Sequence, residues 1–193
     1  MRRTYVFLAI VTGSLFAREA MTPKYQMGKM TDPRDGVTYA TTTILGHTWM
    51  AENIASLDVV KDGKFDCYDR KNVNCDTLGR LYSWWGALHI CPDGWHLPNG
   101  DDWKSLLVVT SGLNLLKDGP DSWGFSALMG GVAGKDENGK DMSSGKSEFG
   151  AFWSSNAIDV DHAQMLFVKK TGKFIVSNNA GKGVLASVRC IKD

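Results

Sequence analysis

The stretch that most constrains the fold of this chain is residues 91–103, which read CPDGWHLPNGDDW. Pro-Asp-Gly has the residue types of a tight turn, and Trp-His-Leu is a short strand that the second proline ends. Asn99 then stands where a helix N-cap belongs, with two aspartates in the first turn, where the helix dipole favours negative charge. Apolar residues follow at helical spacing to about residue 111, and Gly112 can end the helix. The stretch therefore predicts a turn, a strand and a helix in immediate succession, starting at a cysteine.

Length and composition suit a single domain with a substantial core. The chain has 193 residues, of which 43% are hydrophobic, and this excludes a disordered polar chain. Its formal net charge is +1 and it has no basic run, so nothing indicates nucleic acid or an anionic membrane surface as a partner.

The first twenty residues differ from the rest. Arg2 and Arg3 precede a short apolar run over 5–16, which is the layout of a secretory signal peptide and is too short for a comfortable membrane span. We expect residues 1–20 to be removed, leaving no transmembrane segment, and the chain to be secreted or held on the outer surface of a bacterium. The alternative is a buried N-terminal strand or helix. Residues 21–36 are polar and turn-rich and predict a lead-in to a domain over 37–193.

Export makes the four cysteines interpretable as disulfides rather than as reactive thiols. Four cysteines allow three pairings. Cys67 and Cys75 bracket a polar loop, so a local pair would close it, and Cys91 would then bridge to Cys190 near the end of the chain. Zinc ligation needs CxxC-type spacing or a nearby histidine pair, and the sequence has neither.

Hydrophobic patterns predict the remaining elements. We expect a hairpin over 37–51, an irregular excursion over 54–77, a helix over 78–90, a strand over 125–132, a strand over 150–155, a hairpin formed by 164–169 and 173–177, and a last strand over 184–191.

Several short motifs, in order, resemble one family. They are GRLYSW at 79–84, CPDGWHLP at 91–98, Trp103, GFSAL at 124–128, FWSS at 152–155 and SVRC at 187–190, preceded by MTDPRDG at 30–36 and WMAEN at 49–53. This series resembles the Fibrobacter succinogenes major paralogous domain over roughly residues 30–193. The family is placed in the C-type-lectin-like superfamily.

The resemblance implies an α+β, C-type-lectin-like fold, with two helices packed on short antiparallel strands, long loops and two disulfides. It implies a scaffold more than an activity, because no family-wide catalytic residues can be carried over. The fold commonly carries ligand recognition on its long loops, and the family is associated with the surface of polysaccharide-degrading bacteria. The calcium-binding tripeptide of true C-type lectins is not matched, because Leu97-Pro98-Asn99 lacks its acidic or amide partner. We expect no metal and no other cofactor.

The long polar loops between 117 and 162 are the expected binding region. Trp123 lies in a loop where its indole could stack on a sugar ring or a partner, although burial beside Phe125 fits the sequence equally well. The other candidate ligand-binding residues are polar: Asp136, Glu137, Asn138, Asp141, Asp159, Asp161 and His162.

We therefore expect a non-catalytic binding or adhesion module whose partner is a plant-type polysaccharide or a surface protein. The first alternative is a structural component of a surface assembly, with inert loops. The second is a hydrolase that uses Asp159, Asp161 or His162 for acid and base chemistry.

Overall fold

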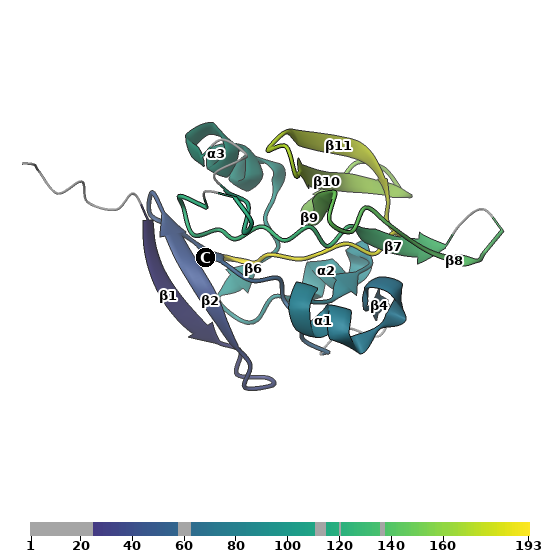
Figure 1. Cartoon of the computed structure of the whole chain (residues 1–193), viewed down its shortest axis with the longest axis horizontal. Coiled ribbons are helices and arrows are strands. Elements are labelled where there is room, and N and C mark those ends of the chain that lie inside the picture. Colours follow the sequence, from purple (N-terminus) through teal and green to yellow (C-terminus); the bar gives the residue numbers. More distant parts are fainter. Residues whose placement is uncertain (1–24, 58–62, 111–114, 120, 136–137) are drawn as a thin grey trace, which may run out of the picture.

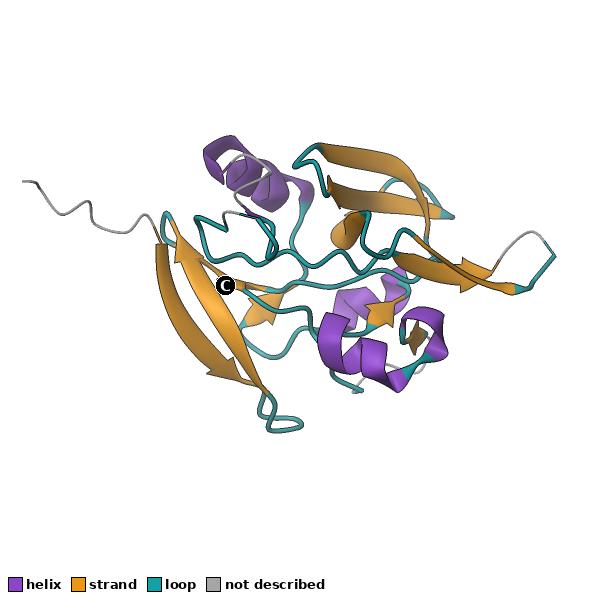
Figure 2. Cartoon of the chain, viewed as in Figure 1, coloured by secondary structure: helices purple, strands orange, loops and turns teal. Residues whose placement is uncertain are grey.

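The computed structural model describes residues 25–57, 63–110, 115–119, 121–135 and 138–193. The described residues form an α+β fold with a five-stranded sheet, a three-stranded sheet and two short two-stranded ribbons (Figures 1 and 2). In this part of the chain, no helix combines the length and apolar character that crossing a bilayer requires. The predicted signal peptide and Gly112 lie outside the described residues.

The five-stranded sheet has the order β1-β2-β3-β12-β6 and is antiparallel throughout. Its strands are β1 (Tyr25–Thr31), β2 (Thr38–Ile44), β3 (His47–Met50), β6 (Trp95–His96) and β12 (Ile191–Lys192). The predicted 37–51 hairpin is thus confirmed as β2 and β3. The predicted lead-in over 21–36 is wrong in part, because residues 25–31 pair along the whole of β2.

The three-stranded sheet has the order β11-β10-β9. Its strands are β9 (Phe149–Ala157), β10 (His162–Lys169) and β11 (Phe174–Gly181), which confirms the predicted late strand and hairpin. Neighbouring residues of β9 face opposite ways, so Trp153 enters one core cluster with Met50 and Val188, whereas Phe152 enters the other with Trp49 and Trp103. The sheet therefore lies between the two halves of the core.

The helices are short. They are α1 (Asn72–Leu78), α2 (Trp84–Ile90) and α3 (Gly100–Thr110), and the 3₁₀ turn η1 (Tyr68–Arg70) precedes α1. The two ribbons are β4 (Phe65–Asp66) with β5 (Leu81–Tyr82), and β7 (Val132–Lys135) with β8 (Asp141–Ser144). The expected loop after Cys67 thus contains a helix, α1, that the polar sequence did not indicate.

The predicted helix over 78–90 is wrong in its first half. Gly79 has φ +75°, and a Cβ there would lie 2.6 Å from Cβ of Asn53, so the chain turns sharply beside another segment. Tyr82 is extended because its backbone exchanges hydrogen bonds with Ala186, at 2.8 and 3.0 Å. The helix starts only after Ser83, whose hydroxyl accepts a hydrogen bond from the Gly86 amide.

Both disulfides form as predicted, Cys67–Cys75 and Cys91–Cys190. The second ties the end of α2 to the C-terminal segment, which runs through the middle of the molecule (Figure 1). The predicted strand over 184–191 is shorter than expected: only its last residue joins a sheet strand, β12, and residues 185–187 make single bridges to three different segments.

Arg189 lies in the centre of this segment and is fully buried. Its guanidinium donates to Oδ1 of Asn53 at 2.7 Å, to the carbonyls of Met50 and Phe125, and to the carbonyl of Ser126 at 2.7 Å. Burial lowers the pKa of Arg189 to about 9, so it is still charged at neutral pH. The predicted strand over 125–132 is wrong except at Val132, which begins β7, and at two residues that make single bridges. The carbonyls of residues 125 and 126 face the Arg189 charge instead of pairing in a sheet.

Asp32 holds the turn between β1 and β2 against α2. Its fully buried carboxylate receives two side-chain hydrogen bonds from Arg34, at 2.9 and 2.7 Å, and Arg34 also donates to the carbonyl of Ile90 at 2.6 Å. The Arg34 hydrogen bond lowers the pKa of Asp32 below its ordinary range.

We expect Arg189→Met to destabilise the protein by about 3–5 kcal/mol, because it leaves several buried carbonyls without a donor. Urea unfolding followed by tryptophan fluorescence measures the change. Lys192→Met, at an exposed position, is the control and should change the free energy of unfolding by less than about 0.5 kcal/mol. Equal stabilities of the two variants would contradict the role given to Arg189.

Asp32 should make stability depend on pH. Its pKa is lower in the folded than in the unfolded protein, so its contribution is present above about pH 4 and is lost as the pH falls through the folded pKa. Asp32→Ala should therefore cost about 1–3 kcal/mol at pH 7 and much less at pH 2, as measured by chemical unfolding over this pH range. A deficit that is the same at both pH values would show that the charge of Asp32 is unimportant.

Candidate functional site

A cavity of about 510 Å³ forms an open groove between α3 and the three-stranded sheet. Figure 1 shows α3 beside β9, β10 and β11. We call it the α3 groove, and it is lined by Gly100, Asp101, Lys104, Leu107, Val108, Asn156, Gln164 and Val176.

Asn99 fixes where the helical wall of the groove begins. Its Oδ1 accepts hydrogen bonds from the amides of Asp101 and Asp102, at 2.8 and 3.1 Å, and Oδ2 of Asp102 accepts the Asn99 amide at 2.8 Å. This is a reciprocal cap of the kind that defines a helix start. The predicted N-cap is thus confirmed.

Two amide side chains attach the start of α3 to the sheet. Oδ1 of Asn156, on β9, accepts the Gly100 amide at 2.7 Å. Gln164, on β10, lies against Gly100, where a Cβ would come within 2.5 Å of its Oε1. Nε2 of Gln164 donates to Oδ1 of Asn178 at 3.0 Å, so the polar row continues onto β11.

The groove also offers polar atoms that have no partner within the described structure. Nδ2 of Asn156, Oε1 of Gln164, the carboxylate of Asp101 and the ammonium of Lys104 make no hydrogen bond or ion pair there. Leu107, Val108 and Val176 supply an apolar part of the lining. A few converging polar groups on a partly apolar wall are typical of a ligand site.

Trp123 does not belong to an exposed site. It is only 6% exposed and packs in the core cluster that contains Trp103 and Phe125, and its carbonyl accepts a hydrogen bond from the Thr42 hydroxyl at 2.7 Å. The prediction of a stacking indole is therefore wrong, and the alternative, burial beside Phe125, is correct. The burial of Trp123 results from its packing between β2 and α3, which are distant in sequence, so no local pattern predicts it.

The expected loop over 135–141 is described only in part. Asp136 and Glu137 lie outside the described residues. Asn138 is an exposed turn residue, and Asp141 is the first residue of β8.

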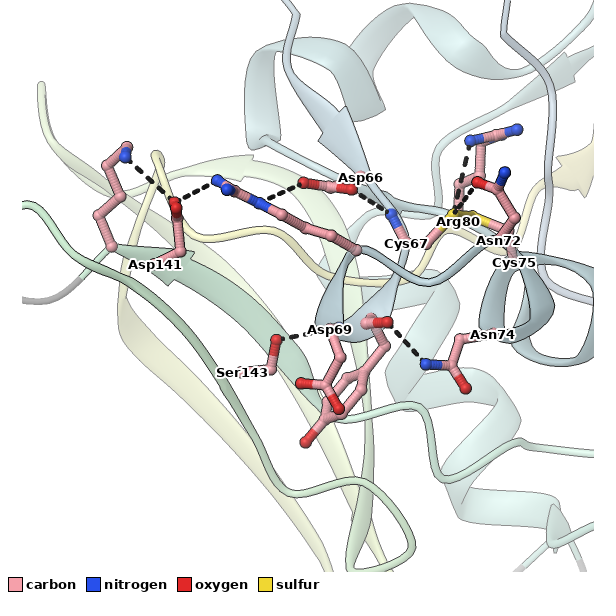
Figure 3. Close-up of polar contacts among 12 residues, drawn as sticks. Asp66, Cys67, Asp69, Asn72, Asn74, Cys75, Arg80, Asp141 and Ser143 are labelled. Atoms are coloured by element: carbon pink, nitrogen blue, oxygen red, sulfur yellow. Dashed lines mark hydrogen bonds and ion pairs between the residues drawn. A yellow bond between two sulfur atoms is a disulfide. The ribbon is translucent and has the colours of Figure 1, made fainter.

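Asp141 is engaged in ion pairs that join the β7–β8 ribbon to the small disulfide loop (Figure 3). Lys135 lies 3.1 Å from its carboxylate, Arg70 also pairs with it, and Arg70 reaches Asp66 at 3.3 Å. The Lys135 hydrogen bond and then the charge of Arg70 lower the pKa of Asp141. The arrangement holds two loops together and leaves the Asp141 carboxylate occupied.

Asp159, Asp161 and His162 do come together, in the turn between β9 and β10. Oδ1 of Asp159 accepts the amides of Asp161 and His162, at 2.8 and 2.7 Å, and lies 2.9 Å from Nδ1 of His162. The Asp161 amide, followed by the His162 side chain, lowers the pKa of Asp159. A catalytic acid needs the opposite shift.

Lys182 and Trp85 lie beside this turn, and neither was a sequence candidate. The ammonium of Lys182 donates to the carbonyls of Asp159 and Val160, at 2.7 and 3.2 Å, and lies 4.4 and 4.8 Å from the ring centroids of Trp84 and Trp85. Trp85 is 45% exposed. The sequence signal for its exposure was the position of Trp85 at the edge of the apolar helical pattern formed by Trp84 and Leu88.

No pattern in the sequence predicted the α3 groove. Asp101 was recognised only as a helix-start residue, and Asn156, Gln164 and Lys104 are isolated polar residues on three different elements. No spacing connects them, because the contact between α3 and the sheet brings them together.

The described residues contain no group of three or more His, Cys, Asp or Glu side chains suited to holding a metal ion.

Comparison with known proteins gives one match. The model of the Fibrobacter succinogenes major domain matches residues 43–192. No curated protein and no solved structure matches the chain. Because the matched region covers most of the sequence, the chain belongs to the Fibrobacter succinogenes major domain family.

Proposed function

We propose that this protein is a non-catalytic binding module of the bacterial cell surface and that the α3 groove binds a segment of a polysaccharide. The observation that carries the proposal is the set of unpartnered polar atoms around the groove, from Asp101, Lys104, Asn156 and Gln164. We further propose that the α+β scaffold is C-type-lectin-like, a proposal supported by the disulfide from the end of α2 to the C-terminal segment.

The chemistry of the groove fits a hydroxyl-rich, uncharged chain. Each sugar hydroxyl both donates and accepts, so it pairs with an amide nitrogen, an amide oxygen or a carboxylate. The Asp101 and Lys104 charges have opposite signs, which gives no preference for an anionic or a cationic ligand. The apolar side chains of Leu107 and Val108 can contact the C–H face of a sugar ring.

The number of carboxylates at the groove and the pKa of Asp159 support binding, rather than hydrolysis, as the function. Glycosidases place two carboxyl groups on either side of the scissile bond, whereas the described lining of the groove contains a single carboxylate, that of Asp101. Asp159, one of the three residues of the hydrolase alternative, has a lowered pKa. Export is supported by the signal-peptide pattern and by the two disulfides, which persist in oxidising compartments.

Asp101→Ala tests the groove. Retention on insoluble cellulose or xylan, together with a glycan array, identifies a ligand, and calorimetry with a matching soluble oligosaccharide measures its affinity. We expect Asp101→Ala to weaken binding about tenfold or more, because a hydrogen bond to a charged group contributes about 1.5–3 kcal/mol.

Two controls locate the site. Asp76→Ala removes an exposed helical aspartate on α1 and should not change affinity. Trp85→Ala removes the exposed indole of α2 and should also leave it unchanged. If Trp85→Ala abolishes binding while Asp101→Ala does not, the ligand binds beside the β9–β10 turn and the groove proposal is wrong. If no glycan is retained, the carbohydrate proposal fails and a structural role at the surface takes its place.

Gly100→Ala separates binding from folding. The added Cβ would displace the Gln164 amide, which is the flexible end of a side chain, so the cost to stability should be within about 1 kcal/mol, offset by the better helix propensity of alanine. Ligand affinity should fall, because Oε1 of Gln164 leaves the groove. Thermal unfolding and calorimetry on the same sample check both parts. An unchanged affinity would remove Gln164 from the site.

A further inference from the structure

The outer edge of β11 has the features of an interface. In the described structure β11 pairs with β10 on one side only, and Figure 1 shows it at the margin of the molecule. Edge strands are usually protected from pairing by charged side chains or proline. The β11 sequence FIVSNNAG contains neither, and Ile175 and Val176 are 38% and 50% exposed.

Cavities lie on both faces beside this edge. Val176 lines the α3 groove, whereas Ile175 and Ser177 line a second cavity of about 460 Å³ on the opposite face. The second cavity also contains Phe149 and Phe167, whose rings are 5.4 Å apart. Successive side chains of a strand point to opposite faces, so a strand added beside β11 would place its side chains alternately over the two cavities.

The charges at the two ends of β11 have opposite signs. Lys169, Lys170 and Lys173 surround the turn before β11. At the other end, Gly181 pairs with His162, and Asp161 accepts the Lys182 amide at 2.8 Å. The ammonium of Lys182 points inward, onto two carbonyls and two indole rings, so the exposed charge at this end is that of Asp159 and Asp161.

This distribution of charge favours a second copy of the chain as the partner, in an antiparallel orientation. If a second copy of the chain pairs with β11 in antiparallel orientation, the lysine end of each copy meets the aspartate end of the other. A parallel arrangement would oppose like charges at both ends. Antiparallel pairing is also the arrangement that a two-fold axis generates.

We propose that this protein forms a symmetric dimer in which β11 pairs with β11 of a second copy, joining two three-stranded sheets into one of six strands. This goes beyond the proposed ligand binding and needs no ligand. It would also place two α3 grooves on one particle, and such bivalence raises the avidity for a polymer.

Sedimentation of the full chain over a range of concentrations tests the dimer. We expect a concentration-dependent dimer that Val176→Lys converts to a monomer with an unchanged thermal midpoint, because Val176 is exposed. Val73→Lys, at a valine of α1 that is also exposed, should leave the dimer intact. A wild-type chain that is monomeric throughout, or a dimer that Val176→Lys does not affect, would overturn the proposal.

A charge exchange tests the orientation. Lys173→Asp and Asp161→Lys should each weaken the dimer, and the double variant should restore it. The side chains of Lys173 and Asp161 make no hydrogen bond or ion pair within the described chain, so their replacement should leave the fold intact. If the double variant dimerises as weakly as the added losses of the two single variants predict, the antiparallel pairing is wrong.

A cysteine near the middle of β11 tests the contact directly. All four native cysteines are in disulfides, so Ser177→Cys supplies the one free thiol. Mild oxidation should link two copies rapidly through Ser177→Cys and slowly through Met142→Cys, an exposed control on β8. Equal rates would exclude a contact at β11.

Discussion

The structure depends on one buried charge, the guanidinium of Arg189. Its hydrogen bonds collect oxygen atoms from the end of β3, from Asn53 and from the loop at 125–126, segments that are 63 to 139 residues away in sequence. Among the described residues no carboxylate bonds to it, and its Cζ lies 4.6 and 5.7 Å from the ring centroids of Phe125 and Phe152. A buried charge is tolerated only if its donors are satisfied. The need to satisfy them fixes the path of all three segments.

Two adjacent residues of the C-terminal segment therefore attach it to the rest of the fold, one through hydrogen bonds and the other through a disulfide. Arg189 joins it to the first hairpin and to the loop before β7, and the neighbouring Cys190 joins it to the end of α2. Phe152 and Trp153 pack on opposite faces of the three-stranded sheet, and Phe152 makes a bridge to Ser187, so the C-terminal segment also determines where β9 lies. Since β9 carries Asn156, the position of the α3 groove depends on buried residues, Arg189 and Cys190, that do not line it.

Sequence reasoning succeeded where a local interaction decides the conformation. The Asn99 cap, the Lys169–Lys173 turn and the β2–β3 hairpin are fixed by residues a few positions apart, and both disulfide pairings followed from cysteine spacing. It failed where a distant partner overrides the local pattern. Residues 125–126 have the pattern of a strand but turn to Arg189, and Leu81 has helical spacing with Trp84 but lies in a ribbon because Tyr82 pairs with Ala186. Trp123 could not be placed for the same reason.

This division explains why the sequence motifs identify the family but do not point to the α3 groove. Within the region that the family model matches, the sequence motifs contain residues of the scaffold: Asn53, Cys91, Trp103, Phe125, Trp153, Arg189 and Cys190. Lys104, Asn156 and Gln164 line the α3 groove from outside these motifs. Replacing them alters hydrogen-bonding groups at the surface and leaves the Arg189 interactions intact. A fold held together in this way can change its surface groups without changing its core, so a ligand of the proposed site would be selected by the groove residues rather than by the motifs.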